Sequence, residues 1–70
     1  MSPFELIGKN IRAARRQAHL AQIDLAEMVG INRAYLSEIE NGRRNMTIGI
    51  LMAVADALKI RLSDILSGIE

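Results

Sequence analysis

Residues 22–41 contain the pattern that most restricts how this chain can fold. Two short runs of helical periodicity are separated there by only three residues, Gly30-Ile31-Asn32. The apolar positions of the two runs are Leu25, Ala26, Val29, Leu36 and Ile39. Two helices joined by so short a turn must cross at a steep angle.

Three residues suit this crossing. Ala26 falls where the two helices would approach most closely, so a larger side chain would push them apart. Gly30 ends the first helix, where the backbone often enters the left-handed region that glycine adopts freely. Asn32 is a good N-cap for the second helix. Any helical hairpin shows similar apolar spacing, but these three features in register favour a helix-turn-helix unit over residues 22–41.

The composition narrows the class of protein further. Seventy residues suffice for a single domain, 1–70, with one small core. Half of the residues are hydrophobic, with one proline and one tyrosine, and this composition is typical of an all-α protein. The absence of cysteine excludes disulfides and fits a cytoplasmic location. No apolar run approaches the ~18 residues of a membrane span, and no secretory signal is visible.

Charge is unevenly distributed along the chain, although the net charge is only +1. Residues 1–20 hold four basic residues and one acidic residue, whereas residues 21–41 hold one basic and four acidic residues. Arg43 and Arg44 follow directly. Positive charge therefore flanks the helical pair on both sides in the sequence. A helix that lies in a DNA groove needs such charge beside it to bind the phosphate strands.

Three further helices are predicted outside the central pair. The first follows the capping-box residues Ser2 and Glu5 and ends near Ala18. Its apolar stripe comprises Phe4, Ile7, Ile11, Ala14 and Ala18, and Gly8 weakens it slightly. The fourth helix follows Thr47, with a predicted buried stripe of Ile48, Leu51, Met52, Ala55 and Leu58. The fifth is expected from Asp64 to about Ser67, with Ser63 as its cap.

A known family shows the same combination of residues across nearly the whole chain. The residues are Ile11-Arg12, Arg15, Gln22, Leu25-Ala26, Gly30-Ile31, Tyr35-Leu36-Ser37, Ile39-Glu40-Asn41-Gly42, Arg44, Ala55, Leu58, Leu62 and Ile65-Leu66. With them the chain resembles the DNA-binding domain of lambda-type phage repressors, the Cro/C1-type or xenobiotic-response-element (XRE) family. Residues 32–37 and 42–45 are also similar to controller proteins of restriction–modification systems. Ala21 departs from the family, which usually has a capping Ser or Thr there.

The resemblance implies a compact five-helix bundle whose third helix, about residues 32–41, is the recognition helix. It implies a sequence-specific transcriptional regulator, most simply a repressor, that binds a palindromic operator in double-stranded DNA as a homodimer. Base contacts are expected from the exposed N-terminal part of the recognition helix. These candidates are Asn32, Arg33, Ala34, Ser37 and Glu38. Arg33 suits a guanine, and Glu38 suits the amino group of a cytosine.

Backbone contacts are expected from polar residues on either side of that helix. These candidates are Gln22, Tyr35, Asn41, Arg43, Arg44 and Asn45. Gln22 opens its helix and would meet a phosphate there. In the family, the residues that match Arg15 and Glu40 form a partly buried ion pair, so the same structural pair is expected here.

The sequence suggests two protein partners, a second copy of this chain and RNA polymerase. Late apolar residues exceed the needs of one small core, which predicts a homodimer interface at Ile50, Ile60, Ile65 and Ile69. Asp24 and Glu27 lie on the expected outer face of the second helix, where solvation explains them. A sharper hypothesis makes Glu27 part of an acidic patch that contacts RNA polymerase, as in activating relatives.

Two other functions are alternatives to the regulation of transcription. An antitoxin-like or adaptor module would use the apolar C-terminal helices to bind another protein. An enzyme would need catalytic or cofactor-binding groups, and the sequence has no cysteine nucleophile, carboxylate–histidine constellation or glycine-rich phosphate loop. His19 is the only histidine and has no carboxylate at ligand spacing beside it. No catalytic activity, cofactor, metal or small-molecule substrate is therefore expected.

Overall fold

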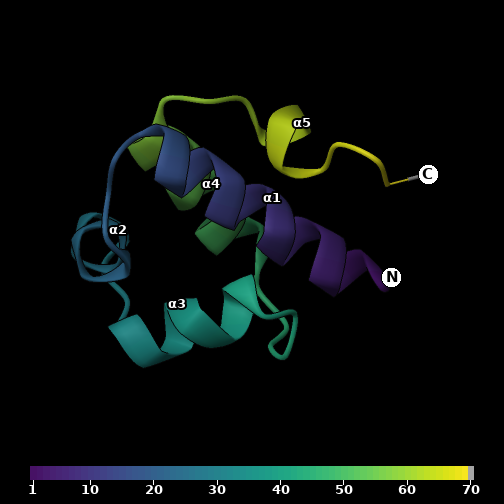
Figure 1. The fold of residues 1–70 in the computed structure, drawn as a ribbon, viewed down its shortest axis with the longest axis horizontal. Helices are drawn as coiled ribbons and strands as arrows, with labels where there is room; N and C mark the ends of the chain where they lie inside the picture. The colour runs from purple at the N-terminus through teal and green to yellow at the C-terminus, as the bar shows by residue number, and fades with distance from the viewer. Residues whose placement is uncertain (70) are drawn as a thin grey trace.

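The computed structural model describes residues 1–69, which form an all-α fold of five helices (Figure 1). The helices are α1 (Pro3–Gln17), α2 (Gln22–Val29), α3 (Arg33–Glu40), α4 (Ile48–Leu58) and α5 (Leu62–Ile65). The prediction of a compact five-helix bundle is confirmed. In Figure 1, α3 and α5 lie on opposite sides of α1, and α4 lies behind α1 in this view.

One hydrophobic core joins all five helices. Its fully buried large side chains come from α1, α2, α3, α4 and α5, and they are Ile11, Leu25, Leu36, Ile39, Val54 and Ile65. The predicted stripe of α1 is correct at Ile7 and Ile11, but Phe4 is 40% exposed because it lies in the first turn, beyond the core. Burial of apolar surface from every helix is the main source of stability for so small a domain.

The turn between α2 and α3 has the conformation that its sequence predicts. Gly30 adopts φ +86°, which a residue with a side chain rarely does. The Asn32 side chain accepts a hydrogen bond of 2.7 Å from the backbone N–H of Tyr35 and so caps α3. Ala26 is buried, as the close crossing of the two helices requires. These local signals fix the direction in which α3 leaves the turn.

Helices α1 and α3 approach so closely at Gly8 that no side chain fits between them. A Cβ atom on Gly8 would lie only 2.7 Å from the backbone oxygen of Glu40, and the oxygen of Ile39 is also in contact. The interpretation of Gly8 as a mild weakness of α1 therefore misses its role. The glycine costs some helix stability but allows the backbone of α3 to rest directly on α1.

Helices α4 and α5 differ from their predicted details. The buried face of α4 includes Val54, whereas Ile48 and Met52 are 60% and 57% exposed. Helix α5 begins at Leu62, and its N-cap is Arg61, so the prediction of Ser63 as the cap is wrong.

The N-terminal end of α5 is stabilised from within the helix, and its other end is held by α1. The Asp64 carboxylate accepts a hydrogen bond of 2.9 Å from the backbone N–H of Arg61. Across the bundle, the Asn10 side chain donates to the carbonyl oxygens of Ile65 and Ser67 at 2.8 and 2.9 Å. These bonds satisfy carbonyl groups that so short a helix leaves unpaired.

Candidate nucleic-acid interface

The N-terminal end of α3 projects into solvent while the rest of the helix is anchored in the core. Asn32, Arg33 and Ala34 are exposed, whereas Leu36 and Ile39 are completely buried. Two buried anchors on an eight-residue helix leave its first turn free to enter a groove without any change in the core. The remaining base-contact candidates, Ser37 and Glu38, are partly exposed.

The loop after α3 adds exposed basic groups beside the recognition helix. Arg43, Arg44 and Asn45 are all exposed. The guanidinium carbon of Arg44 lies 4.9 Å from the centre of the Tyr35 ring, within the range of a cation–π interaction. The Tyr35 hydroxyl donates a hydrogen bond of 3.5 Å to the backbone oxygen of Asn45. Tyr35 therefore connects α3 to the loop.

Arg44 also forms an ion pair with the recognition helix. Its Nη1 atom lies 3.3 Å from Oε1 of Glu38, and both side chains are about half exposed. A predicted backbone contact and a predicted base contact are therefore bonded to each other in the free protein. Sequence spacing did not indicate this pair, because it joins a helix to an irregular loop.

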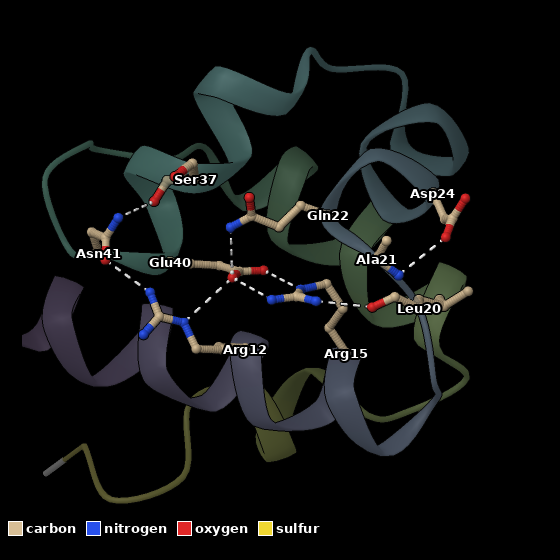
Figure 2. Close-up of polar contacts among 9 residues, drawn as sticks. All are labelled: Arg12, Arg15, Leu20, Ala21, Gln22, Asp24, Ser37, Glu40 and Asn41. Carbon is tan, nitrogen blue, oxygen red and sulfur yellow. Dashed lines mark hydrogen bonds and ion pairs between the residues drawn. The ribbon is translucent and has the colours of Figure 1, made fainter.

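A buried carboxylate organises the polar contacts between α1, α2 and α3 (Figure 2). Arg15 donates to Glu40 through Nε at 2.7 Å and Nη2 at 3.0 Å, so these residues form the ion pair implied by the family resemblance. Arg12 and Gln22 donate to the same carboxylate at 3.5 and 3.1 Å. The remaining Arg15 nitrogen donates to the Leu20 carbonyl at 2.8 Å. Among residues 1–69, no buried side-chain polar atom lacks a hydrogen-bond partner.

These contacts set the charge state of Glu40. Burial acts to raise the pKa of the Glu40 carboxyl, but hydrogen bonds from Arg15, Gln22 and Arg12 outweigh it and hold this pKa below its ordinary value. The hydrogen bond to Glu40 raises the pKa of the Arg15 guanidinium. Both partners are therefore ionised at neutral pH, and each compensates the charge that the other buries.

Two expected phosphate contacts take part in this network in the free protein. The Gln22 side chain points to Glu40, as Figure 2 shows. Asn41 accepts a hydrogen bond of 2.8 Å from Nη2 of Arg12 and donates one of 2.9 Å to the Ser37 carbonyl. Sequence analysis assigned no contact to Arg12. Its spacing of three residues from Arg15 places both on one side of α1 and could have indicated a shared partner.

The N-terminus of α2 lacks a side-chain cap, as Ala21 implies. The Asp24 carboxylate compensates in part by accepting a hydrogen bond of 3.0 Å from the Ala21 backbone N–H. Asp24 and Glu27 are both exposed, which agrees with their expected place on the outer face of α2. The contact between Glu27 and RNA polymerase stays a hypothesis.

The apolar surface late in the chain differs from the expected dimer interface. Ile65 is completely buried in the core, so its assignment to a subunit interface is wrong. Ile50 and Ile60 are partly buried, and Ile69 is 38% exposed. The larger exposed apolar side chains of α4 are those of Ile48 and Met52, four residues apart. A separation of four residues places both side chains on the same face of α4.

The part of the chain that the structure describes contains neither a metal-ion site nor a membrane-spanning helix. Within residues 1–69, no group of three potential metal-binding side chains comes together. No helix in the same range combines the length and apolar character that crossing a membrane requires.

Together, the turn at Gly30 between α2 and α3, the side-chain cap of α3 and the basic loop that follows it define a helix-turn-helix domain. Residues 11–65 match the helix-turn-helix family model HTH_3. Because this match covers most of the chain, the protein belongs to the HTH_3 (XRE-like) family of helix-turn-helix transcriptional regulators.

Individual relatives include repressors and controller proteins. The chain is 42% identical over 59 residues to the immunity repressor protein of Bacillus phage phi105, covering 84% of this chain but 41% of the repressor. It is 33% identical over 63 residues to control protein C.SmaI of Serratia marcescens, covering 90% of this chain and 75% of that protein.

A solved structure shows the same fold. The restriction-modification controller protein C.AhdI from Aeromonas hydrophila matches with a TM-score of 0.86 and 29% sequence identity. The match covers 89% of this chain and 94% of C.AhdI.

Proposed function

We propose that this chain is a sequence-specific DNA-binding repressor of transcription that binds a palindromic operator as a homodimer. The observation that carries the proposal is the exposed first turn of α3, which presents Asn32, Arg33 and Ala34 above a fully buried anchor. A helix supported in this way can enter the major groove and read base edges. The relation to a phage immunity repressor supports repression as the mode of regulation.

The proposed contacts divide into two groups. Base contacts come from Asn32, Arg33, Ala34, Ser37 and Glu38. Backbone contacts come from Gln22, Tyr35, Asn41, Arg43, Arg44 and Asn45. Gln22 and Asn41 must change or share their hydrogen bonds with the Glu40 network when they meet a phosphate. This exchange is accessible because Asn41 is exposed and Gln22 is partly exposed.

A dimer follows from the size of one domain. The Cα atoms extend over 30 × 22 × 21 Å, and successive half-sites lie about 34 Å apart on one face of DNA. One copy therefore reads one half-site, and its few phosphate contacts bind weakly alone. We propose that Ile48 and Met52 of α4 form the centre of the dimer interface, with further apolar surface from Ile50, Ile60 and Ile69.

The first experiment is selection of bound duplexes from a random DNA pool at two salt concentrations. We expect a two-fold symmetric motif, with binding that falls steeply as salt rises. Arg33→Ala should weaken binding to that motif, whereas Arg61→Ala, which removes an equal charge from the N-cap of α5, should have a smaller effect. Enrichment of no sequence would contradict the proposal and favour the antitoxin-like or adaptor function.

The dimer interface has its own test. Met52→Lys should produce a monomer in light scattering and weaken binding to the selected duplex. Met28→Lys is a matched control, because Met28 on α2 is 55% exposed and Met52 is 57% exposed. If both variants remain dimeric, the interface lies elsewhere.

A further inference from the structure

The pair formed by Glu38 and Arg44 places opposite charges at the centre of the proposed DNA-binding surface. Glu38 belongs to α3 and Arg44 to the following loop, and their atoms Oε1 and Nη1 are 3.3 Å apart. If Arg44 meets a phosphate, the phosphate and Glu38 compete for one guanidinium group. Any DNA that takes Arg44 leaves the Glu38 carboxylate close to a polyanion.

We propose that Glu38 is a specificity-determining residue that suppresses binding to non-cognate DNA by competing with phosphate for Arg44. This inference rests on the proposed function, because it concerns the same surface. Non-specific binding depends almost entirely on attraction between basic side chains and phosphates. A neighbouring carboxylate therefore weakens binding to every sequence, unless the sequence supplies a partner for that carboxylate.

Tyr35 holds the Arg44 guanidinium in place while Glu38 and a phosphate compete for it. Its ring lies under the Arg44 guanidinium at 4.9 Å, and its hydroxyl donates to the backbone oxygen of Asn45 at 3.5 Å. The ring can retain the guanidinium while the partner changes from carboxylate to phosphate, because a cation–π contact leaves guanidinium N–H groups free at the edge. Tyr35 is therefore a positioning residue for Arg44.

The exposure of the pair makes the exchange of partners feasible. The side chains of Arg44 and Glu38 retain 52% and 47% of their accessible surface. Ion pairs with this exposure are weak and are screened by salt. This separates the pair from Arg15 and Glu40, whose side-chain exposures are 10% and 0% and which cannot part without leaving a buried charge.

A cognate site can relieve the effect of the free carboxylate. The amino group of a cytosine in the major groove donates to a carboxylate, so a correctly placed cytosine gives Glu38 a new partner. At such a site Arg44 and Glu38 both exchange one partner for another. At other sites only Arg44 gains a new partner, and the Glu38 carboxylate is left without one. This difference lowers the affinity for non-cognate DNA relative to the cognate site. Penalising competing sequences in this way is a recognised source of specificity.

The test compares affinities for two duplexes, the one selected from the random pool and one of unrelated sequence, at low salt. Glu38→Gln should tighten binding to the unrelated duplex by about threefold to tenfold. It should tighten binding to the selected duplex by less, or weaken it, so that the ratio of the two affinities falls. Raising the salt concentration should reduce the gain.

Two comparisons separate this mechanism from a simple change of net charge. Glu27→Gln removes the same charge from the exposed surface of α2, and it should raise both affinities by less than about twofold. In an Arg44→Gln background, Glu38→Gln should lose most of its effect, since the competed group is absent.

An equal gain from Glu38→Gln with and without Arg44 would overturn the inference, as would an unchanged affinity ratio. Either result leaves the proposed DNA-binding function intact. Failure of the unmodified protein to bind any duplex would refute the function and the inference together. Tyr35→Phe, which keeps the ring, should preserve the Glu38→Gln effect, and Tyr35→Leu should reduce it.

Discussion

Replacement of Glu40 by glutamine should destabilise the domain far more than its position at the end of α3 would suggest. Glu40 is 3% exposed and accepts hydrogen bonds from three side chains. Glu40→Gln keeps the size of the side chain but leaves the guanidinium of Arg15, a residue that is only 8% exposed, without a counter-charge. Removing one member of a buried pair costs about 3–5 kcal/mol.

That loss is large relative to the stability of the whole domain. Seventy residues correspond to a free energy of unfolding of about 4–10 kcal/mol. At about 4–8 °C per kcal/mol, the melting temperature should fall by at least ~12 °C. Urea unfolding followed by helical circular dichroism measures the change, and the loss should appear as a lower midpoint at an unchanged slope.

Two further variants make the reasoning refutable. Glu38→Gln is a matched control, because it breaks a half-exposed pair that contributes at most about 1 kcal/mol. The double variant Arg15→Met with Glu40→Leu removes both charges and should recover most of the loss. A Glu40→Gln variant as stable as Glu38→Gln, or a double variant no better than Glu40→Gln alone, would refute the account of a compensated buried charge.

Three other predictions concern stability. Gly8→Ala should lower the free energy of unfolding by about 2 kcal/mol or more because its Cβ would meet the backbone of α3, whereas Gly49→Ala, with no neighbour nearer than 3.6 Å, should raise it by about 0.5 kcal/mol. Urea titration of both variants checks this, and equal effects would show that α1 and α3 can separate cheaply. Ala21→Ser should raise the melting temperature, since Ala21 already has the φ −74° and ψ 161° of an N-cap and a hydroxyl there adds about 0.5–1 kcal/mol. An unchanged melting temperature would mean that Asp24 already supplies all the capping that α2 can use. Because the pKa of Glu40 is lowered in the folded state, its contribution is present above the ordinary carboxyl pKa and is lost as pH falls through the folded value. Unfolding measured between pH 7 and pH 3 should therefore show declining stability in acid, and this decline should be smaller in Glu40→Gln.

Most of the fold could be predicted because its boundaries are set by local chemistry. The predicted break at Gly30-Ile31-Asn32 falls between the end of α2 at Val29 and the start of α3 at Arg33. Gly30 and Asn32 determine those ends through backbone conformation and a side-chain cap, and both effects involve only neighbours in sequence. Thr47 caps α4 in the same way.

The buried face of α4 could not be predicted from periodicity. Nine of its eleven residues, Ile48–Leu58, are apolar, so hydrophobic side chains point in every direction and no single stripe is selected. Only packing against the other helices determines that Val54 is buried and that Met52 is exposed. The misplaced dimer residue Ile65 has the same origin, since apolar character does not distinguish a core from an interface.

The candidate site could be proposed from the sequence as a set of residues, and that assignment stays a prediction, but the contacts among these residues could not be derived from the sequence. The position of Arg33 follows from the turn, and the basic loop is visible in the sequence. The bond between Glu38 and Arg44 and the use of Gln22 and Asn41 inside the protein depend on how an irregular loop and three helices meet in space. Pair spacing within one helix carries no information about such contacts.

The close approach of α1 and α3 at Gly8 limits how the two copies of the proposed dimer could adapt to DNA. Backbone rests on backbone there, and the bonds from Arg12 and Arg15 to the end of α3 add to the restraint. The recognition helix therefore has almost no freedom to tilt within its own domain. In the proposed dimer, the distance and the angle between the two α3 helices would therefore depend only on the contact between the subunits. In the proposed dimer, a different spacing between half-sites would then require substitutions on α4 and not at the proposed base-contact residues of α3.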